Sequence, residues 1–318
     1  MRKADAPEFF TTAPLKKFDT VCAVRIIVAL TLLLTSSLAL SQVTPRPKLL
    51  EATVTYMSGA LRIKAFTVRS DVAGRLPAVI LNHGGTDGVT WATKQRARDL
   101  ARAGFAVFAS AYRGEGGSDG RIEIAAGEVS DVLEGMRWFS KQPYVDADRI
   151  GMLGSSHGAL IGLLAAARSS QVKALVFAYG VADIYAWYEY LVQSKQLGTD
   201  ALTRRVYGNG PADKPQNFLE RHGLRVVPQL PSAMPILIQQ GELDVIVPPA
   251  QAGALAAELT RFEKPFTLEV YPNSAHGFVT AREAVIKRYG ADSVQALESQ
   301  RAWQQIVAFL KRTLEPRR

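Results

Sequence analysis

Apolar and polar residues alternate along this chain in a pattern that predicts strands and helices in turn. Between residues 51 and 69, the segments ATVTYMS and LRIKAFTVR alternate like two strands of a hairpin joined at Ser58-Gly59. Residues 76–82, LPAVILN, form a continuous apolar run, which is typical of a strand buried on both faces. A helical spacing of apolar residues follows over residues 91–103, and Gly104 ends it.

The same order of strand and helix continues to the end of the chain. A further buried strand is predicted at residues 105–113 and other strands at residues 150–153, 172–180, 235–240 and 266–272, with helical faces at residues 129–136, 159–167, 252–259 and 303–310. This alternation predicts the α/β class, with a mostly parallel central sheet flanked by helices on both faces. In such a sheet, reacting groups gather at the carboxyl ends of the strands.

One long interval, at about residues 182–232, interrupts the alternation. It contains no clear buried strand and is rich in aromatic residues, namely Tyr185, Trp187, Tyr188, Tyr190 and Tyr207. An insertion of this length inside a compact domain is usually a cap over a site. Some of these aromatic side chains must also pack the insertion onto the body, so we expect both roles. Trp187 and Tyr188 are the candidates for contact with substrate.

The first forty residues have the features of a targeting segment. Residues 26–40, IIVALTLLLTSSLAL, form an uncharged and mostly apolar run of 15 residues, which is shorter than the about 20 that span a membrane. Basic residues precede the run, and Ala39 and Ser41 stand where a signal peptidase reads small residues. We therefore expect a signal peptide over residues 1–41, with export to the periplasm or the medium. An uncleaved N-terminal anchor is the alternative.

Composition and charge narrow the classes of function. The chain of 318 residues is 47% apolar, which is enough for a sizeable core in a domain over residues 42–318. Its one cysteine, Cys22, lies in the expected leader, so the mature chain would have no disulfide, thiolate metal site or cysteine nucleophile. Without the leader, the net charge falls from +9 to +7. This charge is dispersed, so we expect neither a nucleic-acid partner nor stable membrane association after cleavage.

A candidate nucleophile lies between a predicted strand and a predicted helix. Gly154, Ser156 and Gly158 form the pattern G-x-S-x-G within RIGMLGSSHGALIG. A serine on a tight strand-to-helix turn needs glycines two residues before and two after it, because the neighbouring chain is pressed close on both sides. The helix would direct its positive end, and the N–H of His157, at an anionic intermediate. An ordinary glycine-rich loop is the alternative.

A serine hydroxyl needs a base, and the base needs an acid to orient it. Of the four histidines (His83, His157, His222 and His276), we favour His276 as the base, because it follows the last predicted strand. His157 adjoins the serine, so its side chain is expected to point away. The acid should follow the preceding strand, where we prefer Asp244 over Glu242, which lies one residue from the strand end and should face solvent. The order serine, acid, histidine is the one that this architecture uses.

A tetrahedral oxyanion needs two N–H donors. His157 supplies one, and the turn of His83, Gly84 and Gly85 after the strand at residues 76–82 supplies the other. Glycines let the backbone approach a reacting carbonyl oxygen, and we choose the N–H of Gly85. Loss of such a donor typically costs about 3–4 kcal/mol of transition-state stabilisation. A glycine turn without this role is the alternative.

With these residues placed, the chain resembles the α/β-hydrolase superfamily. It is most similar to the catalytic domain of the prolyl oligopeptidase (S9) serine peptidases and to their dienelactone-hydrolase-like relatives. The resemblance spans about residues 76–314 and rests on six motifs: NHGG (82–85), AYRGEGGSDG (111–120), GSSHG (154–158), YGNGPADKP (207–215), GELDVIVP (241–248) and YPNSAHGF (271–278). Such peptidases commonly carry a β-propeller ahead of this domain. Only about 35 residues lie between the expected leader and the first core strand, so we expect a stand-alone domain.

The sequence therefore predicts an exported serine hydrolase that cleaves an ester or a short peptide. Ser156, Asp244 and His276 are the expected catalytic residues, Gly85 and His157 the expected oxyanion hole. A stand-alone domain with an aromatic cap favours esters, whereas the family resemblance implies peptidase-like chemistry. No metal or organic cofactor is expected. A non-catalytic binding protein on a hydrolase fold is the competing hypothesis.

Overall fold

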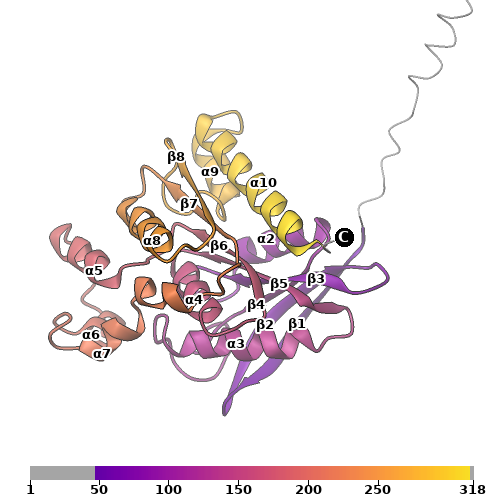
Figure 1. The fold of residues 1–318 in the computed structure, drawn as a ribbon, viewed down its shortest axis with the longest axis horizontal. Coiled ribbons are helices and arrows are strands. Elements are labelled where there is room, and N and C mark those ends of the chain that lie inside the picture. The colour runs from indigo at the N-terminus through magenta and orange to yellow at the C-terminus, as the bar shows by residue number, and fades with distance from the viewer. Residues whose placement is uncertain (1–46, 316–318) are drawn as a thin grey trace, which may run out of the picture. The chain divides into compact units, whose positions relative to one another are not determined.

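The computed structural model describes residues 47–315, which fold around one sheet (Figure 1). Its eight strands are β1 (Leu49–Ser58), β2 (Leu61–Ser70), β3 (Leu76–Asn82), β4 (Ala106–Ser110), β5 (Val145–Ser155), β6 (Val172–Ala178), β7 (Ile236–Gly241) and β8 (Phe266–Tyr271). They lie in the order β1-β2-β4-β3-β5-β6-β7-β8. The expected signal peptide, with its cleavage site before Gln42, lies outside the described residues.

The sheet is antiparallel at one edge and parallel over the rest. β1 and β2 form the predicted hairpin, which turns at Gly59 with a φ of 57°. β2 then pairs with β4 in the antiparallel direction, whereas β4, β3, β5, β6, β7 and β8 all pair in parallel. Because these strands are parallel, their carboxyl ends all lie along the same end of the sheet. The predicted fold class, an α/β-hydrolase fold with a mostly parallel sheet, is confirmed.

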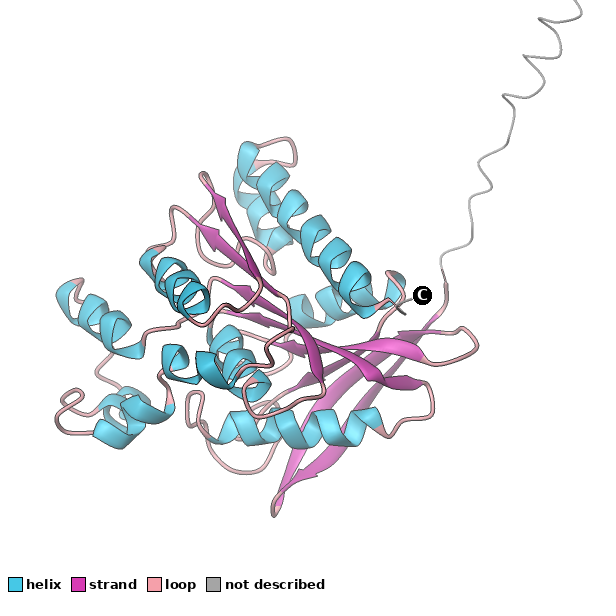
Figure 2. Ribbon diagram, viewed as in Figure 1, coloured by secondary structure: helices cyan, strands magenta, loops and turns pink. Residues whose placement is uncertain are grey.

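Helices cover both faces of this sheet (Figure 2). Side chains alternate between the faces along each strand, so in β3 Ala78 and Ile80 join one core cluster, and Val79 and Leu81 join the other. The first cluster packs against α3 (Gly127–Ser140), α4 (His157–Ala166) and α8 (Ala250–Arg261). The second packs against α2 (Trp91–Arg102) and α10 (Val294–Leu314). Strands β3, β4, β6 and β7 are therefore buried on both faces, as their continuous apolar runs predict, whereas β1 and β8 at the two sides of the sheet are largely exposed.

The interval at residues 182–232 consists of short helices and contains no strand. These helices are α5 (Ile184–Gln193), α6 (Ala201–Tyr207), α7 (Pro215–Glu220) and the 3-10 helix η1 (Gly223–Gln229). Their shared centre is the fully buried ring of Phe218, which lies 5.4 Å from Tyr185, 5.1 Å from Tyr188 and 5.9 Å from Tyr207 between ring centroids. The aromatic residues therefore give the insertion a small core of its own.

Helix α9 (Arg282–Tyr289) was not predicted from the sequence. None of its residues is buried, so it has no apolar face from which a helix could be recognised.

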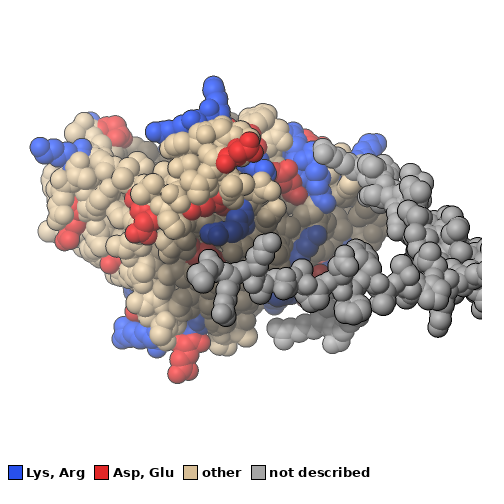
Figure 3. Space-filling view, turned by 90° about the horizontal axis from the view of Figure 1, so that it is seen from above, with Lys and Arg blue, Asp and Glu red and all other residues tan. Residues whose placement is uncertain are grey.

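No helix within residues 47–315 is both long enough and apolar enough to cross a membrane. In the same range, the structure brings together no group of three or more His, Cys, Asp or Glu that could hold a metal ion. On the face seen in Figure 3, basic and acidic side chains are interspersed.

Candidate active site

Ser156 occupies the sharp turn between β5 and α4. Its backbone φ is 54° and its ψ is −124°, a conformation that a side-chain-bearing residue rarely adopts outside such turns. A Cβ on Gly154 would lie 2.4 Å from the carbonyl oxygen of Gly158, and a Cβ on Gly158 would lie 2.2 Å from the carbonyl oxygen of Asn82. Both contacts are too short for any atom to occupy. The two glycines are therefore required by close backbone packing on either side of the serine.

The structure brings Ser156, His276 and Asp244 into one hydrogen-bonded chain. Ser156 Oγ lies 2.9 Å from His276 Nε2, and His276 Nδ1 lies 2.7 Å from Asp244 Oδ2. The Asp244 side chain is fully buried, whereas that of His276 is 22% exposed. A serine, a base and an acid in this arrangement can move a proton off the hydroxyl as it attacks.

Backbone contacts fix the carboxylate of Asp244 in its loop. Its Oδ1 accepts hydrogen bonds from the N–H groups of Ile246 and Val247, both at 2.9 Å. Its Oδ2 faces His276 and also accepts a hydrogen bond from Gln240 Nε2 at 3.4 Å. Glu242, the other carboxylate of the loop, is exposed to solvent.

The loop that carries His276 is held against the Asp244 loop and against α10. The N–H of Leu243 donates to the carbonyl of Ser274 at 3.0 Å, which links the two loops directly. Glu298 of α10 accepts hydrogen bonds from the Asn273 N–H at 3.1 Å and from Ser274 Oγ at 2.7 Å. The contact of Glu298 with this loop could not be predicted from the sequence, because no motif connects α10 with the loop.

The turn after β3 packs directly against the serine. A Cβ on Gly84 would lie 3.0 Å from Ser156 Cβ, and Gly85 has a φ of 70° that favours glycine. Gly85 and Ser156 line the same two cavities. The side chain of His157 was expected to point away from the site. Instead, it contacts the oxyanion turn. Its Nδ1 lies 3.2 Å from the carbonyl oxygen of Gly85 and ties the start of α4 to this turn.

Comparison with known proteins identifies the family of this chain. Residues 91–292, more than half of the chain, match the prolyl oligopeptidase family. The chain belongs to this family. The predicted likeness to S9-type hydrolases is confirmed, and so, at the level of the family, is the prediction of a serine hydrolase.

Proteins that are similar to this chain in sequence or in fold include peptidases and an esterase. Over 227 residues, the chain is 28% identical to an uncharacterized peptidase of Bacillus subtilis, covering 71% of this chain and 86% of the relative. Acylaminoacyl peptidase from Pyrococcus horikoshii has a similar fold, with a TM-score of 0.69 at 17% identity, over 90% of this chain and 44% of that one. A fungal esterase from Rhizomucor miehei gives a TM-score of 0.63 at 20% identity, over 95% of this chain and 93% of that one. The chain thus spans less than half the length of the acylaminoacyl peptidase.

Two cavities of this prolyl oligopeptidase family member meet at Ser156. One, of about 240 Å³, lies under the insertion and has a largely apolar wall that includes Leu160, Ile184, Trp187, Leu202 and Tyr207. The other, of about 420 Å³, lies beside His276 and includes Thr90, Thr93, Arg96 and Tyr179. A substrate bound at Ser156 therefore has room on both sides of the bond that would be cleaved.

The two aromatic candidates for substrate contact lie in different places. Trp187 lines the apolar cavity, and its indole N–H donates to the carbonyl of Ile246 at 3.0 Å. The ring of Tyr188 packs instead in the core of the insertion, against Phe218 and Tyr207. The two residues are neighbours on one helix and point in different directions. The sequence pattern does not show which of these directions faces the cavity.

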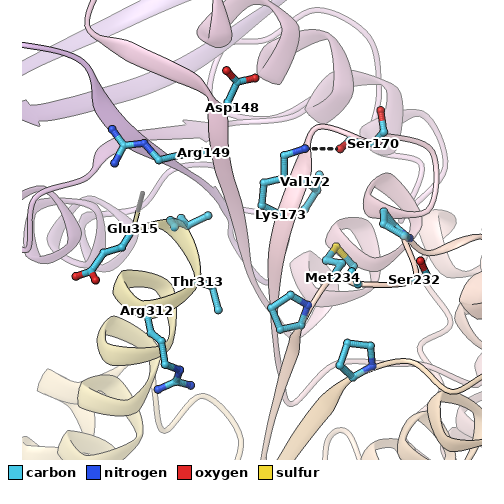
Figure 4. Close-up of a pocket in the computed structure, with 15 residues that line it drawn as sticks. Asp148, Arg149, Ser170, Val172, Lys173, Ser232, Met234, Arg312, Thr313 and Glu315 are labelled. Atoms are coloured by element: carbon cyan, nitrogen blue, oxygen red, sulfur yellow. Dashed lines mark hydrogen bonds between the residues drawn. The ribbon is translucent and has the colours of Figure 1, made fainter. Parts of the chain in front are cut away.

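A third cavity, of about 710 Å³, lies at the amino ends of the parallel strands, on the side of the sheet opposite to Ser156 (Figure 4). Its wall comes from the amino ends of β5, β6 and β7 and from the end of α10, and it includes Arg149, Lys173, Met234 and Arg312. Lys173 Nζ donates to the carbonyl of Ser170 at 3.1 Å. None of the three residues of the hydrogen-bonded chain lines this cavity, so its size alone does not connect it with the serine.

Proposed function

We propose that this protein is an exported serine hydrolase that cleaves an ester or a short peptide through an acyl-enzyme intermediate. The observation that carries the proposal is the hydrogen-bonded chain from Ser156 Oγ through His276 to Asp244, with distances of 2.9 and 2.7 Å. Membership of the prolyl oligopeptidase family supports the same chemistry.

In the proposed reaction, Ser156 Oγ attacks the substrate carbonyl carbon while His276 Nε2 takes the hydroxyl proton. Asp244 keeps the other imidazole hydrogen on Nδ1 and stabilises the imidazolium. The N–H groups of Gly85 and His157 receive the oxyanion. His276 then donates its proton to the leaving group, which departs and leaves the acyl chain on Ser156. Water, activated by His276, releases the acid and restores the serine.

The cavities suggest how a substrate lies. An apolar acyl group suits the cavity of about 240 Å³ beneath the insertion, where Trp187 forms part of the wall. The leaving group then occupies the cavity beside His276. Relatives described as peptidases and esterases indicate a peptide or small-molecule substrate. An apolar pocket of this size favours small esters as substrates.

Fluorophosphonate labelling tests the proposal, because this probe reacts only with an activated serine. We expect the wild-type protein to be labelled at Ser156. Ser156→Ala should abolish labelling and lower kcat by about 10⁶-fold, with an almost unchanged thermal midpoint. Turnover of p-nitrophenyl esters against aminoacyl and prolyl p-nitroanilides then separates esterase from peptidase activity. Persistent labelling of Ser156→Ala would show that another residue is the nucleophile. A wild-type protein that is not labelled would favour a non-catalytic binding protein.

A further inference from the structure

A histidine and a carboxyl group lie buried beneath the turn that carries Gly85. The side chain of His83 is 3% exposed and that of Glu115 is fully buried, with 3.6 Å between His83 Nε2 and Glu115 Oε2. Among the described residues, His83 Nε2 and Glu115 Oε1 have no hydrogen-bond partner. Both residues belong to sequence motifs, NHGG and AYRGEGGSDG, yet the proposed reaction uses neither side chain.

The other nitrogen of His83 holds the peptide unit of the oxyanion turn. His83 Nδ1 lies 3.1 Å from the carbonyl oxygen of Gly84. Because a carbonyl oxygen only accepts, this contact requires the hydrogen of the imidazole on Nδ1. The carbonyl of Gly84 and the N–H of Gly85 belong to one planar trans peptide and point to opposite sides of it. By holding the carbonyl, His83 therefore aims the N–H of Gly85.

Glu115 holds the far end of the same turn. Its Oε2 accepts a hydrogen bond from the N–H of Gly88 at 2.9 Å. A Cβ on Gly88 would lie 3.2 Å from the backbone nitrogen of Gly116, so the turn packs tightly on the segment that carries Glu115. The ring of Tyr112 stacks on His83 at 4.3 Å between centroids. The imidazole thus has a fixed position between Gly84 and Glu115.

The distance of 3.6 Å between Nε2 of His83 and Oε2 of Glu115 is longer than a hydrogen bond, but it favours a proton on one of the two atoms. Without it, a nitrogen lone pair would face a buried carboxylate, which is strongly unfavourable. The proton can lie on the carboxyl group or on Nε2, and the pair has no net charge in either case. In both forms, the hydrogen on Nδ1 stays in place for Gly84.

We propose that Glu115 is a positioning residue, which keeps the imidazole hydrogen of His83 on Nδ1 and thereby keeps the N–H of Gly85 directed at the oxyanion. The inference rests on the proposed function, because it assigns a purpose to the same oxyanion turn.

The surroundings of the pair set the pH at which its shared proton is lost. Burial raises the pKa of Glu115 to about 8 against the opposing Gly88 hydrogen bond, and the negative charges of Glu128 and Asp87 raise it further. Burial lowers the pKa of His83 to about 4. The groups that face the pair come from four segments: Asp87 in the turn itself, Tyr112 and the carbonyl of Ser110 at the end of β4, Glu128 in α3, and His157 in α4.

Loss of that proton at alkaline pH changes the tautomer of His83. The ionised Glu115 attracts the remaining imidazole hydrogen to Nε2, and Nδ1 then presents a lone pair to the carbonyl oxygen of Gly84. The Gly84–Gly85 peptide loses its hydrogen bond, and the N–H of Gly85 is no longer held in place. Because the oxyanion forms only in the transition state, kcat should fall while KM stays nearly constant.

The deciding experiment compares pH profiles of kcat for a p-nitrophenyl ester, corrected for spontaneous hydrolysis, in the wild-type protein and in Glu115→Gln. A glutamine can accept from Gly88 and donate to Nε2 of His83, but it cannot ionise. We expect the wild-type kcat to fall on the alkaline side, by at most the about 10²–10³-fold that loss of one oxyanion donor costs. Glu115→Gln should keep near wild-type kcat at pH 7 and lose the alkaline fall. Glu134→Gln, at a partly exposed position of α3 where the carboxylate pairs with Arg137, is the matched control and should keep it.

Two results would overturn the inference. One is an alkaline fall of equal size in the wild-type protein and Glu115→Gln. The other is a loss of kcat in Glu115→Gln at every pH that matches Glu115→Ala, with unchanged thermal midpoints. Turnover by the wild-type protein at pH 7 separately tests the proposed function.

Nuclear magnetic resonance gives a readout that does not depend on turnover. The ¹⁵N shifts of His83, assigned with a His83→Asn variant, should change from the Nδ1-protonated to the Nε2-protonated pattern between pH 7 and pH 9.5. In Glu115→Gln, the Nδ1-protonated pattern should persist at both pH values. A tautomer that does not change in the wild-type protein would contradict the inference.

Discussion

Asp244 illustrates how individual atoms are assigned within this site. Two backbone N–H groups donate to its Oδ1, and its Oδ2 makes the shorter of its two contacts, 2.7 Å, with the imidazole of His276. The carboxylate therefore determines which nitrogen of His276 carries the hydrogen and which can accept a proton from Ser156. Glu242 lies two residues away but is exposed, so it has no comparable contact with the imidazole.

Parallel substitutions test this difference between the two carboxylates. Asp244→Asn should lower kcat by about 10⁴-fold, because an amide NH₂ favours the wrong tautomer of the histidine. Glu242→Gln is the matched control and should change kcat by less than a factor of three or so. Steady-state kinetics on one ester would measure both. A large loss at position 242 together with a small one at position 244 would reverse the assignment.

At the scale of elements, α4 contributes through how closely it approaches β3. Gly158 lies in its first turn, against the carbonyl oxygens of Asn82 and His83, so the helix and the oxyanion turn touch backbone to backbone. Gly253, an exposed residue in the first turn of α8, has no atom outside its own helix within 4 Å of the place where a Cβ would stand. The two helices thus contain glycines for different reasons.

Alanine at each position makes this contrast measurable. Gly158→Ala should destabilise the protein by about 1–3 kcal/mol through overpacking and should lower kcat, because α4 and the turn must move apart. Gly253→Ala should stabilise it by about 0.5–1 kcal/mol, since alanine loses less entropy in a helix. Thermal or urea unfolding would compare them. Equal effects at the two positions would contradict the close approach of α4 to β3.

At the scale of the whole molecule, three loops and one turn meet at the carboxyl edge of the sheet. Ser156 follows β5, Asp244 follows β7, His276 follows β8, and the turn at Gly85 follows β3. Because these strands are parallel, residues 120 positions apart come within hydrogen-bonding distance. Helices α5 and α6 of the insertion contribute Trp187 and Tyr207 to the wall of the apolar cavity beside Ser156.

The proposal of export also belongs to the whole chain. Produced with its complete N-terminal segment in a bacterium with an outer membrane, the protein should be recovered from the periplasm or medium with Gln42 as its first residue. Ala39→Asp, which removes a small residue that signal peptidase needs, should leave the segment attached. N-terminal sequencing of each cell fraction would measure this. An uncleaved membrane-bound wild-type protein would favour the N-terminal anchor, and an uncleaved protein in the cytosol would contradict export.

Much of the fold could be predicted because each buried strand reads as a short apolar run bounded by turn residues. The ends of strands were less certain: β4 ends at Ser110 rather than at Arg113, and β6 ends at Ala178 rather than at Gly180. Helix α9 has no buried residue and left no signal. At the site, the roles of Glu298 and Glu115 could not be predicted, because each acts on a loop that is distant in sequence.

The sequence by itself determined the order of strands and helices and the candidate residues at 156, 244 and 276, because apolar periodicity and glycine spacing are local properties of the chain. Only the tertiary structure decided which carboxylate meets His276, that Trp187 rather than Tyr188 lines the apolar cavity, and that His83 and Glu115 lie together beneath the oxyanion turn. These contacts join separate elements, and their distances depend on how the sheet packs, which no local pattern of residues encodes.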